Sequence, residues 1–308
     1  MSTLPDIERF RQGNTGVPFV HVLDSGQAGP TVVINALTHG NEIAGAVVLC
    51  RLLDQGPRPA RGRVIAVFAN YAAYALAHED QPAAGRMVDR DFNRVWHPEI
   101  LDGVDQSWET RRARELLPVY KSASALLDLH TTATADPPFL ISSAQAKTLA
   151  LLKRIFIPQL RVLMPCPMHL GRLLIESSAF TDAKSIRIGV VAECGPHRDP
   201  ASIELAWGII LSFLGATGLI APIAIPAQSR PARYFRVRDL IVPQQADFHF
   251  VRPLSSFTPL DAHEVYAQEG RTQLRPGFAK AVVLMPRLRP LAGVEACFLA
   301  EEVEMPRA

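Results

Sequence analysis

The sequence contains few lysines, no cluster of like charges and no glycine-rich phosphate loop. Only five of its 32 basic residues are lysine, the arginines are scattered, and the net charge is +2. Proteins that bind nucleic acid usually carry a clustered basic patch, and nucleotide-binding proteins carry glycine-rich loops between a strand and a helix. These absences argue against nucleic acid as a partner and against a nucleotide-binding fold.

Cysteine is also scarce, and the four cysteines form no CxxC pair: Cys50, Cys166, Cys194 and Cys297. A chain of 308 residues can build a core without disulfides, so we expect free, buried thiols. Cys194 as a nucleophile is an alternative, although no paired histidine can be identified from the spacing. The first ten residues lack an apolar signal core, which predicts a cytoplasmic protein.

One uncharged stretch, from residue 205 to 227, is long enough to span a bilayer. However, Asp199 and Pro200 before it are typical of a helix N-cap and first helical residue, and Gly215 and Gly218 interrupt it. We therefore expect a buried helix from about 200 to 215, then a turn and an extended linker, and no membrane partner.

Apolar runs alternate with helical segments over the first two thirds of the chain. The runs show little polar alternation, as in strands covered on both faces; they lie at 31–37, 63–69, 125–129 and 187–192, and helices are expected at 42–53, 108–120 and 144–155. After Pro226, short β-prone pieces lie between frequent prolines, at 232–237, 248–251 and 281–284. The pattern predicts an α/β fold with a helix-covered, mostly parallel (mixed) sheet in a domain of residues 1–220, and a smaller β-rich domain of residues 221–308.

Potential metal ligands follow two of the predicted strands. His39 and Glu42 come directly after the run 31–37, and His130 follows the run 125–129. Open α/β sheets bind ligands at the carboxyl ends of their strands, and imidazole with carboxylate suits Zn²⁺. Three protein ligands leave the fourth position of a tetrahedral zinc ion for water, whose pKa falls to about 7 when it is bound.

A carboxylate that does not bind the metal is then needed to accept the proton of that water. Glu193, at the end of the run 187–192, is the candidate. Asp128 lies two residues before His130, so it could either orient an imidazole or make a local turn or cap hydrogen bond.

An arginine-rich segment, Arg86 to Arg94 (RMVDRDFNR), follows the second strand. Arginine forks match carboxylates, and Asn93 beside Arg94 could bind the same group. Arg86 could stabilise the oxyanion of a scissile carbonyl. The alternative is a solvated loop whose charged residues pair among themselves: Asp89, Arg90, Asp91 and Arg94.

Together, HGNE at 39–42, RMVDRDFNR at 86–94, DLH at 128–130 and ECG at 193–195 resemble the succinylglutamate desuccinylase/aspartoacylase family, relatives of the zinc carboxypeptidases. The resemblance implies a sheet domain of zinc-carboxypeptidase type followed by a smaller β-rich domain, with one zinc ion per chain. The implied roles are zinc binding by His39, Glu42 and His130, general acid–base catalysis by Glu193, contact of Arg86 with the scissile carbonyl, and carboxylate binding by Asn93 and Arg94.

The sequence also departs from this family. Phe92 stands where leucine is usual, and members selective for acidic substrates carry an arginine about ten residues before the base, where this chain has Ala183 and then Lys184. Whether the substrate has a second carboxylate therefore stays open. Tyr234 and Tyr266 are candidates for the family's C-terminal pocket tyrosine.

The expected activity is that of a zinc-dependent amidohydrolase, acting through a metal-bound water on a small N-acyl amino acid or related N-acyl amine. A zinc carboxypeptidase acting on peptides and a non-catalytic carboxylate-binding protein are the alternatives. The 80-odd residues after the catalytic part favour a small-molecule substrate. The sequence leaves the assembly state open, a homo-oligomer included.

Overall fold

The computed structural model describes residues 4–77, 81, 84–166, 170–222 and 231–305. Its strands are β1 (Val20–Asp24), β2 (Thr31–Ala36), β3 (Arg63–Phe68), β4 (Ala125–Thr132), β5 (Phe139–Ser142), β6 (Leu160–Leu163), β7 (Ile188–Pro196), β8 (Arg233–Ile241), β9 (His249–Phe250), β10 (Pro259–Leu260), β11 (Ala267–Glu269), β12 (Thr272–Leu274), β13 (Ala281–Leu284) and β14 (Cys297–Val303). Its helices are α1 (Ile43–Gln55), α2 (Tyr71–Ala75), α3 (Pro98–Leu101), α4 (Trp108–Ser122), α5 (Ala146–Leu152), α6 (Ser178–Thr181) and α7 (Pro200–Thr217), with 3₁₀ turns η1 (Glu8–Phe10), η2 (Phe92–Arg94) and η3 (Leu174–Glu176).

Eleven of these strands form one mixed sheet in the order β1-β3-β2-β4-β7-β5-β6-β8-β14-β13-β10. Its centre is parallel, because β2 pairs in parallel with both β3 and β4, and β4 with β7. The apolar runs of β2, β4 and β7 are almost wholly buried, as expected for central strands with both faces covered. The structure thus confirms the predicted α/β fold with a mixed sheet.

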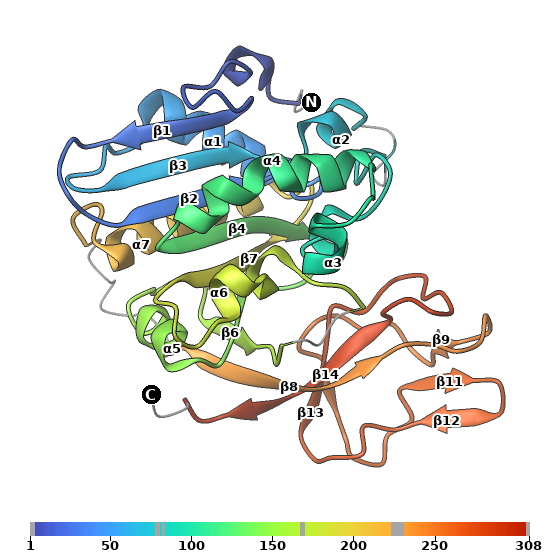
Figure 1. The fold of residues 1–308 in the computed structure, drawn as a ribbon. Helices are drawn as coiled ribbons and strands as arrows, with labels where there is room; N and C mark the ends of the chain where they lie inside the picture. The colour runs from blue at the N-terminus through green and yellow to red at the C-terminus, as the bar shows by residue number, and fades with distance from the viewer. Residues whose placement is uncertain (1–3, 78–80, 82–83, 167–169, 223–230, 306–308) are drawn as a thin grey trace.

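Helices cover both faces of the sheet, with α1 and α7 behind it and α4 in front in Figure 1. Each face has its own apolar core: Leu49 and Phe213 belong to the α1/α7 side, and Leu116 and Tyr120 of α4 belong to the other. This three-layer packing holds the parallel strands in register. Side chains at the strands' carboxyl ends are therefore placed by a rigid scaffold.

The uncharged stretch after residue 200 is a helix, as predicted. Asp199 caps α7 through its side chain, Pro200 is the first helical residue, and Gly218 ends the helix with a positive φ of 77°. By length and composition α7 could cross a membrane, but half of its apolar window is buried in the protein, and it packs against α1 and β7. It has the position of a core helix. The linker predicted after it lies in part outside the described residues.

The C-terminal region is rich in strands, as expected, but much of it extends the main sheet. β8 pairs in parallel with β6, and β14 and β13 follow it in antiparallel pairing. β9, β11 and β12 form a second, three-stranded sheet. The division at residues 220 and 221 stays a prediction, since the boundary expected near 216–228 falls partly outside the described part of the chain.

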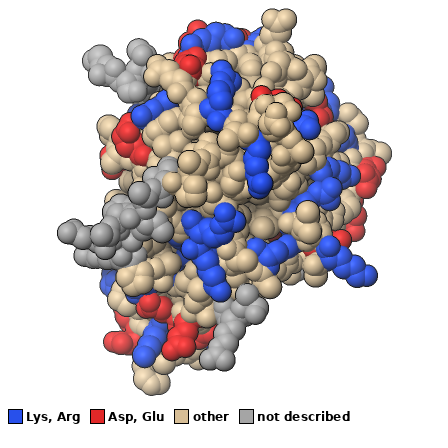
Figure 2. Space-filling view, turned by 90° about the vertical axis from the view of Figure 1, so that its left-hand side faces the viewer, with Lys and Arg blue, Asp and Glu red and all other residues tan. Residues whose placement is uncertain are grey.

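Figure 2 shows the edge of the molecule at which the parallel strands begin. Lysine and arginine side chains lie there in several groups separated by uncharged surface. Ala183 belongs to this edge, because it precedes β7, and its neighbours Asp182 and Lys184 line a shallow cavity with Ser122 and Ser124. Position 183 is thus at the opposite end of β7 from Glu193.

Candidate metal centre and active site

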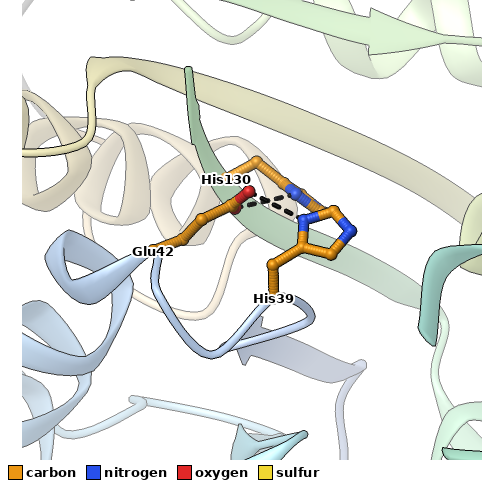
Figure 3. Close-up of side chains that lie close together, drawn as sticks. All are labelled: His39, Glu42 and His130. Carbon is orange, nitrogen blue, oxygen red and sulfur yellow. Dashed lines mark hydrogen bonds and ion pairs between the residues drawn. The ribbon is translucent and has the colours of Figure 1, made fainter. Parts of the chain in front are cut away.

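His39, Glu42 and His130 come together at the carboxyl edge of the central strands (Figure 3). His39 Nδ1 lies 2.7 Å from Glu42 Oε1, and His130 Nδ1 lies 3.0 Å from Glu42 Oε2. The three side chains are buried, and one potential ligand atom of each lies within 4.8 Å of the others. Two imidazoles and one carboxylate are the donor set of a catalytic zinc site. The cluster therefore fits a metal ion.

The distal nitrogen of each imidazole has its own carboxylate partner. His130 Nε2 lies 2.9 Å from Asp128 Oδ2, and His39 Nε2 lies 3.1 Å from Asp91 Oδ1. For His130, the Asp128 carboxylate favours a hydrogen on Nε2 and leaves the Nδ1 lone pair for a metal. The role of Asp91 was not predicted, because 52 residues separate it from His39 and no local pattern links them.

The charged groups of the cluster shift one another's pKa values. Burial would raise the pKa of Glu42, but His39 and His130 outweigh it and hold that pKa well below its usual value. Burial would lower the pKa of His130, but Asp128 and Glu42 raise it well above the usual value. Glu42 is thus held as the carboxylate, the form that a metal ion needs.

Asp128 orients His130 and does not make the local cap considered from the sequence. Its side chain is fully buried, and its other oxygen, Oδ1, accepts hydrogen bonds from Asn35 Nδ2 at 2.7 Å and Thr38 Oγ1 at 2.8 Å. Tyr120 in turn donates to Asn35 Oδ1 at 2.6 Å. The network fixes both oxygens of Asp128, and hence the plane of the His130 ring.

We expect Asp128→Asn to weaken metal binding by about 10- to 100-fold, the usual loss when a ligand's outer hydrogen-bond partner is changed. The amide removes one negative charge behind His130 while keeping the side chain's size. Competition with a chromogenic chelator would measure the affinity. Asp239→Asn, in β8 and away from the cluster, is the control; equal affinities of the two variants would contradict the role of Asp128.

Glu193 lies beside the cluster because β4 and β7 pair with His130 opposite it. The sequence suggested that His130 and Glu193 lie just after the ends of their strands. Both lie within a strand instead, because β4 continues to Thr132 and β7 to Pro196. The Glu193 side chain is buried, and its Oε2 has no hydrogen-bond partner among the described residues. Burial raises the pKa of Glu193 to about 8, and the nearby Glu42 carboxylate contributes to the rise. This is a carboxyl group suited to exchanging protons near neutral pH.

The same shift predicts a pH effect on the stability of metal-free protein. Between the ordinary pKa of a glutamate, about 4.5, and about 8, the folded state binds a proton at Glu193 that the unfolded state has lost. Its contribution to stability therefore falls as pH rises through this window. Urea unfolding of metal-free wild type and Glu193→Gln at pH 5 and pH 8 would check this: the variant should gain relative stability at pH 8, and a constant difference would contradict it.

The Arg86 side chain reaches the cluster from the loop before η2. Arg86 Nη2 lies 2.9 Å from Asp91 Oδ2 and 2.9 Å from His39 Nε2. The alternative, in which Asp89, Arg90, Asp91 and Arg94 pair among themselves, is wrong. Arg90 pairs with Asp105, Arg94 with Glu295, and Asp91 with Arg86. Arg86 is partly exposed and lines the cavity next to the His39–Glu42–His130 cluster.

A buried carboxylate of α4, Glu109, holds this loop in place. It accepts backbone hydrogen bonds from Val88 at 2.6 Å and from Asp89 and Arg90 at 3.1 Å. Glu109 belongs to the helix predicted at 108–120, and its side chain is fully buried. Gly40, beside His39, leaves no room for a side chain, because a Cβ there would lie 2.2 Å from the backbone nitrogen of Tyr74.

Asn93 and Arg94 also line this cavity. Asn93 Oδ1 accepts a hydrogen bond from the backbone of Leu174 at 2.9 Å, which directs its amide nitrogen away from that backbone. Arg94 Nη2 donates to Glu295 Oε2 at 2.5 Å. Glu295 comes from the loop before β14, 201 residues away, and its role could not be read from the sequence.

The cavity has a volume of about 380 Å³, which suits a small molecule. Residues of the C-terminal region form part of its wall, including Met285, Arg287 and Arg289. The candidate tyrosines do not: Tyr234 and Tyr266 are buried in apolar cores. His197 does line the cavity, with its Nδ1 2.7 Å from Thr131 Oγ1.

The Cys194 thiol is poorly suited to act as a nucleophile. Cys194, beside Glu193, is buried, and burial raises the pKa of its thiol well above the usual value, which disfavours a nucleophilic role. Cys50 and Cys297 are also free and buried, as predicted, whereas Cys166 is exposed.

Residues 28–204 match the family described as the succinylglutamate desuccinylase/aspartoacylase catalytic domain. The chain belongs to this family. This confirms the resemblance of the four motifs. The family takes its name from a desuccinylase and an aspartoacylase, which are deacylases that hydrolyse amide bonds.

Among curated proteins, a probable aspartoacylase of Parasynechococcus marenigrum (strain WH8102) is 29% identical over 171 residues. The match covers 54% of this chain and 53% of that protein, so it spans about half the length of the relative.

Solved structures share the fold over most of the chain. Succinylglutamate desuccinylase from Vibrio cholerae has a TM-score of 0.75 at 17% identity, covering 94% of this chain and 86% of that one. The enzyme from Chromobacterium violaceum has a TM-score of 0.68 at 20% identity, covering 94% and 90%. The coverage extends the likeness of fold into the strand-rich C-terminal region.

Proposed function

We propose that this protein is a zinc-dependent amidohydrolase that removes the acyl group from a small N-acyl amino acid or a related N-acyl amine. The observation that carries the proposal is the convergence of His39, Glu42 and His130 next to a buried carboxyl group, Glu193, with a free oxygen. Membership of a deacylase family supports the reaction class.

The three clustered side chains would hold the zinc ion, which when bound supplies Lewis-acid chemistry for the hydrolysis of an amide. Glu193 would accept the proton of the attacking water and return it to the nitrogen of the departing amine. Its raised pKa suits both transfers, since the group must be deprotonated for the first and protonated for the second.

The arginines would bind the substrate's oxygen atoms. Arg86 would donate to the carbonyl oxygen on which negative charge develops. Burial opposes its charge, but Asp91 and Glu42 raise the pKa of Arg86, so it stays a cation. Asn93 and Arg94 would bind the substrate carboxylate.

The test is to purify the protein, measure its metal content and assay a panel of N-acetyl, N-succinyl and N-formyl amino acids with zinc-loaded enzyme. We expect stoichiometric metal and release of a free amino acid from at least one group. A protein that holds no zinc and hydrolyses no member of the panel would refute the proposal. Peptides with free carboxyl termini belong in the same assay, because cleavage of these alone would indicate a carboxypeptidase.

The shape of the cavity favours the small substrate over a peptide. Residues 285–289, between β13 and β14, form part of its wall together with the loop of Arg86 and with η2. A peptide groove would need this side to be open. We therefore propose a small molecule as the partner, and neither nucleic acid nor a membrane.

A further inference from the structure

The loop between β13 and β14 brings two more arginines to the cavity, Arg287 and Arg289, in addition to Arg86 and Arg94. Arg287 lines the cavity and donates from Nε to the backbone carbonyl of Glu295 at 2.6 Å. This bond anchors the Nε end of the Arg287 guanidinium to its own loop. The two terminal nitrogens, Nη1 and Nη2, take no part in this bond.

Arg86 and Arg94 form ion pairs with carboxylates of the protein. Arg86 pairs with Asp91 at 2.9 Å, and Arg94 pairs with Glu295 at 2.5 Å. Glu295 also accepts a hydrogen bond from the backbone of Leu170 at 2.8 Å, so its carboxylate is held in place. A substrate carboxylate would have to share both arginines with these internal partners.

Arg287 differs from them, because no carboxylate among the described residues forms an ion pair with it. The surrounding protein and the positive charges of Arg86 and Arg94 lower the pKa of Arg287, although its side chain remains solvent-accessible. Arg86 and Arg94 repel the charge of Arg287, while Glu295 and Asp91 attract it. An anion bound there would relieve the repulsion.

We propose that Arg287 is a substrate-binding residue that contacts the carboxylate of the N-acyl amino acid, completing the subsite begun by Asn93 and Arg94. The inference rests on the proposed function. It places specificity partly in the C-terminal region and not at position 183, which lies at the opposite edge of the sheet. The ligand class is an N-acyl compound with a free carboxylate.

The test compares Arg287→Ala with wild type on a matched pair, the best N-acyl amino acid from the panel and its primary carboxamide. We expect KM for the acid to rise by about 30-fold, the usual effect of losing a charge-assisted hydrogen bond. We expect kcat for the acid to change little, because the residue does not touch the scissile bond. The kinetics for the carboxamide should be the same in both proteins, and Arg287→Lys should restore part of the loss.

Two controls separate this role from a general effect of charge. Arg271→Ala removes an exposed arginine of the C-terminal region outside the cavity lining and should behave as wild type. Arg289→Ala removes the next arginine of the loop and should have a smaller effect than Arg287→Ala. Equal losses on acid and carboxamide, or a larger effect at Arg289, would overturn the assignment.

A binding measurement separates this inference from the proposed function. Calorimetric titration of metal-free protein with succinate should give clearly weaker binding in Arg287→Ala than in wild type. If no panel compound is hydrolysed, the proposed function fails, and this titration still decides on the anion subsite. Equal succinate binding in both proteins, or none in wild type, refutes the subsite.

Discussion

Replacing Glu193 with glutamine should reduce kcat by about 10²- to 10⁴-fold, the range that positioned general acid–base catalysis contributes. Glutamine has nearly the same shape but can neither accept nor return the proton. Because Glu193 lies next to the His–Glu–His cluster without belonging to it, the variant should keep its metal. Single-turnover kinetics and metal analysis of the same preparation would measure both properties.

Cys194→Ala is a suitable control for this experiment. The two residues are neighbours on β7, and both are buried, but the thiol packs in the apolar core on the α1/α7 side. Its loss should lower stability by about 1 kcal/mol, as for other small core truncations, with kcat within a few-fold of wild type. If Glu193→Gln retained near-normal activity while Cys194→Ala lost it, the acid–base role would be wrong and the thiol alternative would return.

The fold was predictable where the sequence pattern and the local environment agree. The runs in β2, β4 and β7 are apolar at nearly every position because both sheet faces are covered, and α7 carries a cap at each end. The short strands β10, β11 and β12 have two or three residues each, so tertiary pairing and not intrinsic preference decides them. The parallel pairing of β8 with β6, which joins the C-terminal region to the main sheet, leaves no local trace in the sequence.

The residues of the site also fall into those that the sequence pattern indicates and those that only the folded structure brings together. His39 and Glu42 share one loop, and Asp128 is two residues from His130, so spacing alone could suggest them. Asp91, Glu109 and Glu295 could not be found, because each acts on a residue brought near by folding. Arg287 belongs to this second group. The proposed ligands were thus accessible from sequence, but the groups that orient or complete them needed the structure.

Replacing Glu42 with alanine should abolish both metal retention and turnover. Glu42 contacts both imidazoles through its two oxygens, so its loss removes the one negative charge in the proposed ligand set. The metal affinity should fall by more than the 10- to 100-fold expected for Asp128→Asn. Elemental analysis after dialysis, together with the assay of the N-acyl panel, would measure the effect.

Glu42→Ala also removes a buried hydrogen-bond acceptor, since Glu42 Oε2 accepts a backbone hydrogen bond from Thr131 at 3.2 Å. Glu42→Gln keeps an oxygen for that bond and should stay folded by circular dichroism, yet it still loses the charge. Removing the metal from wild type with a chelator should mimic both variants, and adding Zn²⁺ should restore activity to wild type alone. Full activity and a full complement of zinc in Glu42→Ala would show that the metal, if any, lies elsewhere, because no other described cluster of histidine, cysteine and acidic side chains is placed to hold one.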